Sequence, residues 1–204
     1  NQSWDLRVAG TVAGDPVRMV ATAGTAQNAA TTTGSTINVW HHACGVEAAS
    51  NDRRAFIDGG SKGTNTGNRA PAGADRISIG RDGDSTPGTY FSGDLAEAAV
   101  WDIALSDADV ALLAKAVSPL MVHPESLVFY CPIIGSYSPE IDVVGGLNLT
   151  VTGATASAHP RVFYLPKVEW WPTKPAAAGT EALVLQSVTG VASVANLEVG
   201  TPRV

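Results

Sequence analysis

The sequence predicts an all-β protein, an antiparallel two-sheet sandwich with one short helix after a strand that ends at Trp101. Three observations favour this class. Turn residues interrupt the chain about every eight to twelve positions. Apolar and polar side chains alternate in the short segments between the turns, as they do on half-buried strands. A length of 204 residues suits one sandwich domain with a small appendage.

The first part of the chain predicts paired strands. Residues 4–22 have the alternation and the central turn of a hairpin. Residues 24–36 are rich in Thr, Ala and Gly, which favours either a loop or an irregular edge strand. Strands are expected around Trp40 and around Phe56. The polar residues 59–74 then predict a surface loop with a short edge strand.

The next segment predicts two strands followed by a helix. The strands are expected at residues 77–79 and 95–101, the second with small and apolar side chains on both faces. Ser106 supplies a hydroxyl N-cap, and Asp107 and Asp109 place carboxylates in the first turn, where the helix dipole favours them. The helix is therefore expected to begin just after Ser106.

Four ordered motifs carry a family resemblance over roughly residues 4–115. They are Trp40–Val46 with its Trp-His-His start, Arg54–Gly60 with its Asp-Gly turn, Asp75–Gly80, and Tyr90–Val110 with Gly-Asp-Leu, Trp-Asp and Ala-Leu-Ser-Asp. Together they resemble the laminin-G-like and pentraxin-like jelly rolls of the concanavalin A-like lectin and glucanase group. The sequence style is also similar to laminin-G-like virion proteins of tailed bacteriophages. The resemblance implies a jelly roll but no single activity, because this fold hosts lectins, hydrolases, adhesion modules and capsid proteins.

The resemblance also bears on how the domain is completed. The chain opens directly on a strand-like segment, so we expect that N-terminal strands of the jelly roll are missing from it. Residues 127–133 and 142–153 resemble the opening strands of laminin-G-like domains, although they lie near the C-terminal end. They predict either a segment that closes the sheet or a simple extra hairpin.

Three regions are expected along the chain. Residues 1–165 form the jelly roll, and residues 166–180 have the Pro and Ala content of a linker. Residues 181–204 alternate like a strand and predict a C-terminal arm or the start of a further β module. Trp170 and Trp171 stand between prolines, so we interpret them as a docking anchor for a neighbouring molecule or a surface that stacks on sugars.

Composition argues against several partners. The net charge is −6 and the 13 basic residues are scattered, whereas nucleic-acid binding needs a concentrated basic face. No apolar run approaches the ~20 residues of a membrane-spanning helix, and no secretion signal is visible. The two cysteines, Cys44 and Cys131, lie in apolar strand-like runs and are expected to be buried thiols, although a disulfide remains open.

Catalytic motifs are absent from the sequence. The glucanases of the resembled group use a Glu-x-Asp-x-x-Glu strand whose paired carboxylates cleave glycosidic bonds, and nothing in this chain matches it. There is no Gly-x-Ser-x-Gly elbow, no recognisable triad context for a histidine and no zinc-type spacing. The sequence therefore predicts a protein that is not an enzyme.

One metal site is implied by the resemblance. Pentraxins bind calcium through acidic and amide residues of a loop that corresponds to Asp82-Gly83-Asp84 here. Asp82 and Asp84 could offer two of the six to eight oxygens that calcium prefers. The match is partial, and turn chemistry alone also accounts for an Asp-Gly-Asp sequence. No other cofactor is expected.

Two functions remain open. The first is a structural or adhesion protein of a virion, a capsid decoration or tail-fibre type of component that contacts itself, another shell protein or surface glycans. The second is a calcium-assisted carbohydrate-binding module of a secreted or cell-surface protein.

Overall fold

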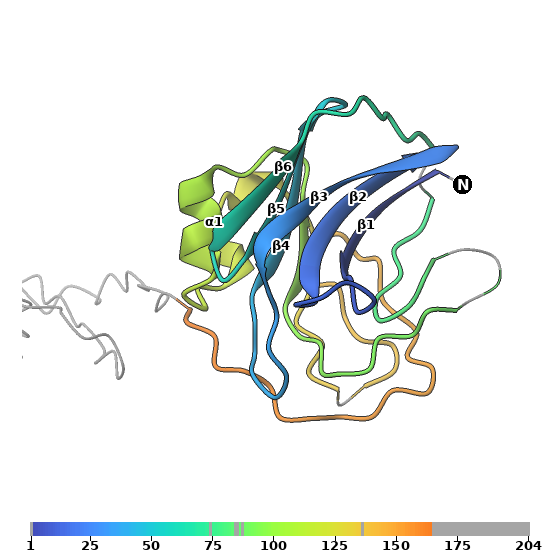
Figure 1. Ribbon diagram of the computed structural model, residues 1–204. Coiled ribbons are helices and arrows are strands. Elements are labelled where there is room, and N and C mark those ends of the chain that lie inside the picture. Colours follow the sequence, from blue (N-terminus) through green and yellow to red (C-terminus); the bar gives the residue numbers. More distant parts are fainter. Residues whose placement is uncertain (1, 74, 84–85, 87, 136, 165–204) are drawn as a thin grey trace, which may run out of the picture. The chain divides into compact units, whose positions relative to one another are not determined.

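A computed structural model describes residues 2–73, 75–83, 86, 88–135 and 137–164. This part of the chain is mostly β, with antiparallel sheets and one α-helix (Figure 1). The predicted all-β sandwich is confirmed. The chain divides into a first unit, Asn1–Tyr164, and a second, Leu165–Val204. Residues 166–180, residues 181–204, Trp170 and Trp171 lie outside the described residues, so the linker, the arm and the docking anchor stay predictions.

The first sheet contains β1 (Gln2–Val8), β2 (Pro16–Ala23) and β3 (Thr25–Gly34) in that order. β1 and β2 pair antiparallel, from Gln2 opposite Ala23 to Val8 opposite Val17, which confirms the predicted hairpin. Residues 24–36 were predicted to form either a loop or an irregular edge strand, and ten of them, Thr25–Gly34, form the strand β3.

The second sheet contains β4 (Ala43–Ala49), β5 (Asp52–Ile57) and β6 (Gly60–Asn65). The strand predicted around Trp40 begins later than expected. β4 starts at Ala43, so Trp40, His41 and His42 precede it. The predicted Asp-Gly turn joins β5 to β6. Asp58 and Gly59 both adopt positive φ, 52° and 72°, the left-handed conformation that a tight hairpin turn requires.

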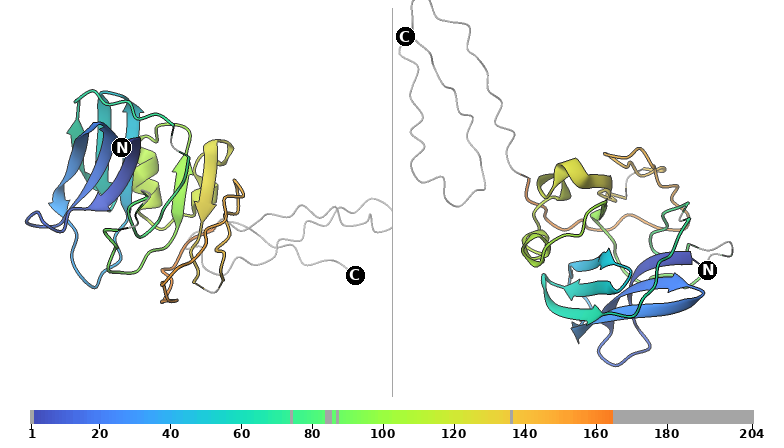
Figure 2. Two further views of the ribbon diagram at one scale, coloured as in Figure 1. Left: turned by 90° about the vertical axis from the view of Figure 1, so that its right-hand side faces the viewer. Right: turned by 90° about the horizontal axis from the view of Figure 1, so that it is seen from above.

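The second sheet lies between the first sheet and the helix (Figure 2, right). Side chains of β5 point alternately to the two sides, as on any strand. Ala55 packs with Met19 and Ala29 of the first sheet. Phe56 packs on the other side, in a larger core with Val46, Leu105, Val110, Leu113 and Val122.

The helix α1 (Asp107–Leu113) is capped as predicted. Ser106 Oγ accepts from the Asp109 amide at 3.2 Å, and the Asp109 carboxylate in turn accepts from the Ser106 amide at 2.9 Å. This reciprocal capping box fixes the first turn. Val110 and Leu113 are buried, so they anchor α1 on the sheet.

A third, two-stranded sheet joins β7 (Ala98–Trp101) to β8 (Leu127–Cys131), with the 3₁₀ turns η1 (Pro119–Met121) and η2 (Pro124–Ser126) between them. β7 is shorter than the predicted strand 95–101, because Glu97 has a φ of 59° and leaves the extended conformation. The predicted strand at residues 77–79 does not form. Residues 127–131 form β8, which pairs with β7 in a two-stranded sheet of its own, and residues 142–153 add only the isolated bridge between Leu149 and Glu140.

Candidate binding surface

A buried carboxylate organises the loop that follows β8. Asp142 is 4% exposed. Its Oδ1 accepts from the amides of Tyr130 (3.0 Å), Val144 (3.1 Å) and Gly145 (3.0 Å), and its Oδ2 accepts from the amide of Leu147 (2.9 Å). The Asp142 carboxylate therefore accepts the amide hydrogen bonds that a neighbouring strand would accept in a regular sheet.

Two further contacts hold the same loop. Glu140 and Leu149 exchange backbone hydrogen bonds of 2.8 and 2.9 Å. A Cβ at Gly145 would lie 2.3 Å from the Val128 carbonyl oxygen, so only glycine lets the loop approach β8 this closely. The loop is thus fixed to the domain by its backbone, and its side chains are free to face solvent.

Burial alone would raise the pKa of the Asp142 carboxyl, because it penalises the charged form. The four backbone amides together outweigh burial and hold the pKa below its ordinary value. Asp142 is consequently a charged structural acceptor at neutral pH.

The outer side of this segment is apolar. Six large apolar side chains of residues 132–149 are exposed, by 42–65% of their area: Ile134, Tyr137, Ile141, Val143, Val144 and Leu147. We call this set the 132–149 surface. An apolar surface on a loop with a fixed backbone is typical of interaction sites.

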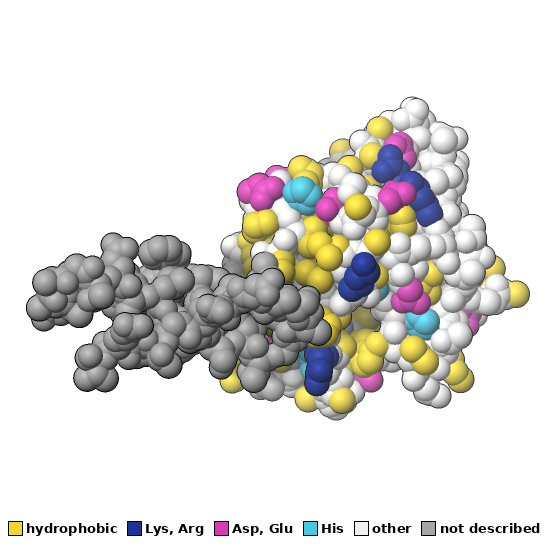
Figure 3. Space-filling model, turned by 90° about the vertical axis from the view of Figure 1, so that its left-hand side faces the viewer, with side chains coloured by type: hydrophobic (Ala, Val, Ile, Leu, Met, Phe, Trp, Pro, Cys, Tyr) yellow, Lys and Arg dark blue, Asp and Glu magenta, His cyan; other side chains and the backbone are white. Residues whose placement is uncertain are grey.

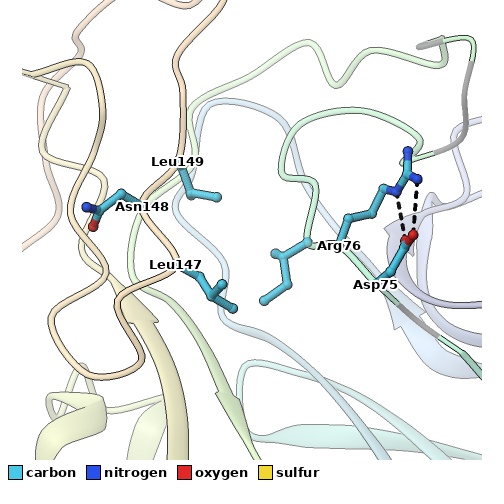
Figure 4. Close-up of a pocket in the computed structure, with 6 residues that line it drawn as sticks. Asp75, Arg76, Leu147, Asn148 and Leu149 are labelled. Atoms are coloured by element: carbon cyan, nitrogen blue, oxygen red, sulfur yellow. Dashed lines mark hydrogen bonds and ion pairs between the residues drawn. The ribbon is translucent and has the colours of Figure 1, made fainter.

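A hollow of about 450 Å³ lies at one end of the 132–149 surface (Figure 4). Leu147 and Leu149 line one wall, and Asp75, Arg76 and Ile77 line the other. Arg76 donates to Asp75 at 2.9 Å, and this ion pair points away from the leucines. The hollow is therefore apolar inside with a charged rim.

A second hollow of about 130 Å³ is lined by residues between Pro132 and Val143. Its lining is apolar apart from one carboxylate and one phenol: Pro132, Ile134, Tyr137, Glu140, Ile141 and Val143. Glu140 is 4% exposed, and its buried Oε1 has no hydrogen-bond partner among the described residues. We call this the Glu140 hollow.

A hydrogen-bonded cluster fastens the last described segment to the third sheet. Tyr130 Oη donates to Glu97 Oε2 at 2.7 Å and lies 3.2 Å from Tyr164 Oη. His159 Nε2 lies 2.9 Å from the Pro132 carbonyl oxygen and 3.2 Å from Glu97 Oε1. Burial raises the pKa of Glu97, although its bonds to Tyr130 and His159 oppose the rise. These groups bond to one another, which gives the cluster a structural role.

A hydroxyl, an imidazole and a carboxylate also meet near the β5–β6 turn. Thr36 Oγ1 lies 2.9 Å from His41 Nε2, and His41 Nδ1 lies 2.7 Å from Asp58 Oδ2. The order is that of a catalytic triad. However, the Thr36 amide already donates to His41 Nε2 at 3.0 Å, so the lone pair that a general base would use is occupied. The chain of bonds ties the loop before β4 to the turn.

The predicted calcium ligands are only partly placed. The Asp82 amide donates to the Gly88 carbonyl oxygen at 3.1 Å, and Asp84 lies outside the described residues. Within the described ranges, no three His, Cys, Asp or Glu side chains gather as a metal site would require. Calcium at Asp82 and Asp84 stays a prediction.

Sequence reasoning missed the 132–149 surface as a site. One signal was present, because Glu140 and Asp142 are acidic residues at alternate positions in an otherwise apolar segment. Charged side chains in such a setting indicate either a buried structural role or a site.

Both cysteines are free: Cys131 is fully buried, and burial raises the pKa of Cys44 to about 12. We expect neither thiol to react quickly with Ellman's reagent in the native protein at pH 8, since the thiolate is the nucleophile. Two thiols per chain should react after unfolding in guanidinium. An absence of reactive thiol in the unfolded protein would instead reveal a disulfide and contradict this expectation.

The charge distribution shows no concentrated basic area on the face in Figure 3. Its basic side chains are separated and stand beside acidic and apolar ones. Within the part of the chain that the structure describes, no helix has the length and apolar character needed to cross a bilayer.

Comparison with known proteins gives one match. Residues 1–111 match a laminin-G-type family model that is described as the concanavalin A-like lectin/glucanases superfamily. No curated protein and no solved structure matches the chain. The matched residues include both three-stranded sheets, β7 and most of α1.

Proposed function

The chain belongs to the concanavalin A-like lectin/glucanase superfamily, and from this premise we propose that it is a non-enzymatic structural or adhesion domain that contacts protein or glycan partners. Binding and structural roles are what this fold suggests at the family level. The observation that carries the proposal is the 132–149 surface, where six apolar side chains are exposed over a backbone that the buried Asp142 holds.

The environments of three carboxylates, Glu47, Glu97 and Asp142, support a role without catalysis. Glu47 binds Arg53, Glu97 binds Tyr130 and His159, and Asp142 is occupied by four backbone amides. Glycoside hydrolysis needs two carboxyl groups that face each other across the substrate with free oxygens. A carboxylate that already accepts several structural hydrogen bonds is a poor nucleophile or base.

The finer proposal is a virion component, of the capsid-decoration or tail-fibre type, located in the particle. It is supported by the sequence resemblance to laminin-G-like virion proteins of tailed bacteriophages. The 132–149 surface would then face a second copy, another shell protein or a surface glycan. The alternative, a calcium-assisted carbohydrate-binding module, has the Asp82 loop as its support.

The proposal is tested by the double variant Ile141→Ser/Val143→Ser, with Ile37→Ser as a matched control. Ile37 is 83% exposed and lies before β4, away from residues 132–149 in the sequence. We expect self-association in analytical ultracentrifugation, or glycan binding on an array, that weakens about tenfold or more in the double variant and is unchanged in the control. Hydrolysis of a glycan by the wild-type chain, or binding that is equal in all three proteins, would contradict the proposal. Loss of glycan binding in EDTA would favour the calcium alternative.

A further inference from the structure

We propose that the Glu140 hollow is a pocket for the ammonium group and aliphatic stem of a lysine side chain presented by a protein partner. The inference rests on the proposed function, because it names the chemistry of a partner at the 132–149 surface. It begins from a lining carboxylate, Glu140, one oxygen of which has no hydrogen-bond partner among the described residues.

Glu140 is a buried carboxylate, and one of its two oxygens lacks a hydrogen-bond partner among the described residues. It is 4% exposed, and its Oε1 is inaccessible to solvent and accepts no hydrogen bond within the described ranges. Leaving a carboxylate oxygen buried and unpaired is costly, since water no longer solvates it and no donor replaces the water. A cation bound in the hollow beside this carboxylate would lower the cost through its charge, which gives the pocket its driving force.

Among the described residues, those that line the hollow supply no cation to Glu140. The other five lining residues are apolar or phenolic, and none is basic. Asp142 is close by. Burial raises the pKa of the Cys131 thiol, and the charges of Glu140 and Asp142 raise it further, so both carboxylates lie near this thiol. The two carboxylates therefore add to a negative field on this side of β8, while Asp142 already has four amide donors.

The shape and polarity of the hollow select the kind of cation. A volume of about 130 Å³ suits an unbranched four-carbon stem better than a large ring. Ile134, Ile141 and Val143 offer apolar walls for the methylene groups, and a stem buried in this way leaves only the charged end to be paired. The Tyr137 ring at the wall can attract an ammonium group through its π face.

A metal ion fits this hollow poorly. Calcium takes six to eight oxygen ligands, and among the lining residues only one carboxylate and one phenol carry side-chain oxygens. A guanidinium group recognises carboxylates through two parallel hydrogen bonds that use both oxygens, and it is broader than an ammonium. Lysine is therefore the side chain that matches the volume, the apolar walls and the one carboxylate of the hollow.

The test uses n-butylammonium as a probe of the lysine side chain and n-butanol as its uncharged control. The full chain, labelled with ¹⁵N, is titrated with each probe and followed by NMR. We expect saturable shifts of the amides of Ile134, Tyr137 and Ile141 with an affinity of about a millimolar, and at least about tenfold weaker binding of butanol.

Two variants make the result specific. Glu140→Gln keeps the shape and removes the charge, so butylammonium affinity should fall about tenfold or more. Glu125→Gln is the matched control, because this exposed glutamate binds His123 and does not line the hollow. It should bind the probe like the wild type. Should Glu140→Gln fail to fold, Tyr137→Leu replaces it, with an expected loss of a few-fold from the missing ring.

Equal affinity for butylammonium and butanol, or an unchanged affinity in Glu140→Gln, would overturn the pocket. The outcome is separable from the proposed function. Butylammonium binding that depends on Glu140, in a chain whose self-association and glycan binding are absent or unaffected by Ile141→Ser/Val143→Ser, would uphold the pocket and reject the role proposed for the 132–149 surface.

Discussion

Replacement of Arg53 by methionine should lower the free energy of unfolding by about 3–5 kcal/mol. Arg53 is fully buried, and its Nε and Nη2 donate to the two carboxylate oxygens of Glu47 at 2.8 and 3.0 Å. The same guanidinium lies within hydrogen-bond distance of four further oxygens, on Asn65, Gly67, Ser50 and Arg69. Methionine would fill the space and leave the Glu47 carboxylate and these oxygens without a donor.

Arg54 provides a matched control for this experiment. It is the next residue on β5, its side chain points to the opposite face, and it is partly exposed where it binds Asp52. Partly exposed ion pairs contribute little, so Arg54→Met should lose far less stability than Arg53→Met. Urea unfolding followed by circular dichroism measures both. Similar losses for the two variants would mean that the buried network is not what stabilises this part of the domain.

Asp142→Asn should cost about 2–4 kcal/mol, because one neutral carbonyl oxygen must replace two charged oxygens that accept four amides. The effect should depend on pH. The folded pKa of Asp142 lies below its ordinary value, so its contribution is fully present above about pH 4 and is lost as the pH falls through the folded pKa. The stability difference between wild type and variant should therefore shrink in strong acid.

Thermal unfolding between pH 7 and pH 2 measures this difference. Asp75→Asn serves as the control, since Asp75 is exposed and its carboxylate forms an ion pair with the neighbouring Arg76 on the surface. That variant should follow the wild-type stability closely across the range. A constant difference between Asp142→Asn and wild type down to pH 2 would show that the carboxylate charge does not hold the loop.

Local signals made much of the fold predictable. The Ser106 cap, the Asp58-Gly59 turn and the hairpin of β1 and β2 all depend on residues close in the chain, and each formed as expected. Errors arose where distant groups decide. β7 is shorter than the predicted strand because it extends only over the residues that pair with β8, and no alternation pattern along the chain reveals that distant partner.

The candidate site was harder to predict for the same reason. Asp142 and Glu140 are ordinary acidic residues in the sequence, and their roles come from burial by a loop that folds back on β8. The predictions for Asp82 and Asp84 came from the family resemblance instead, and they concern a different loop. A sequence records which residues can accept hydrogen bonds, but tertiary packing decides which acceptors are satisfied.

The position of β5 between two cores restricts how this gene can change in length. Insertion or deletion of one codon within Asp52–Ile57 would reverse every side chain beyond it, turning Phe56 toward Met19 and a small alanine toward the helix. Both packing layers would fail at once. Length variation among related chains should therefore collect in the connecting loops, and this strand should keep a constant number of residues.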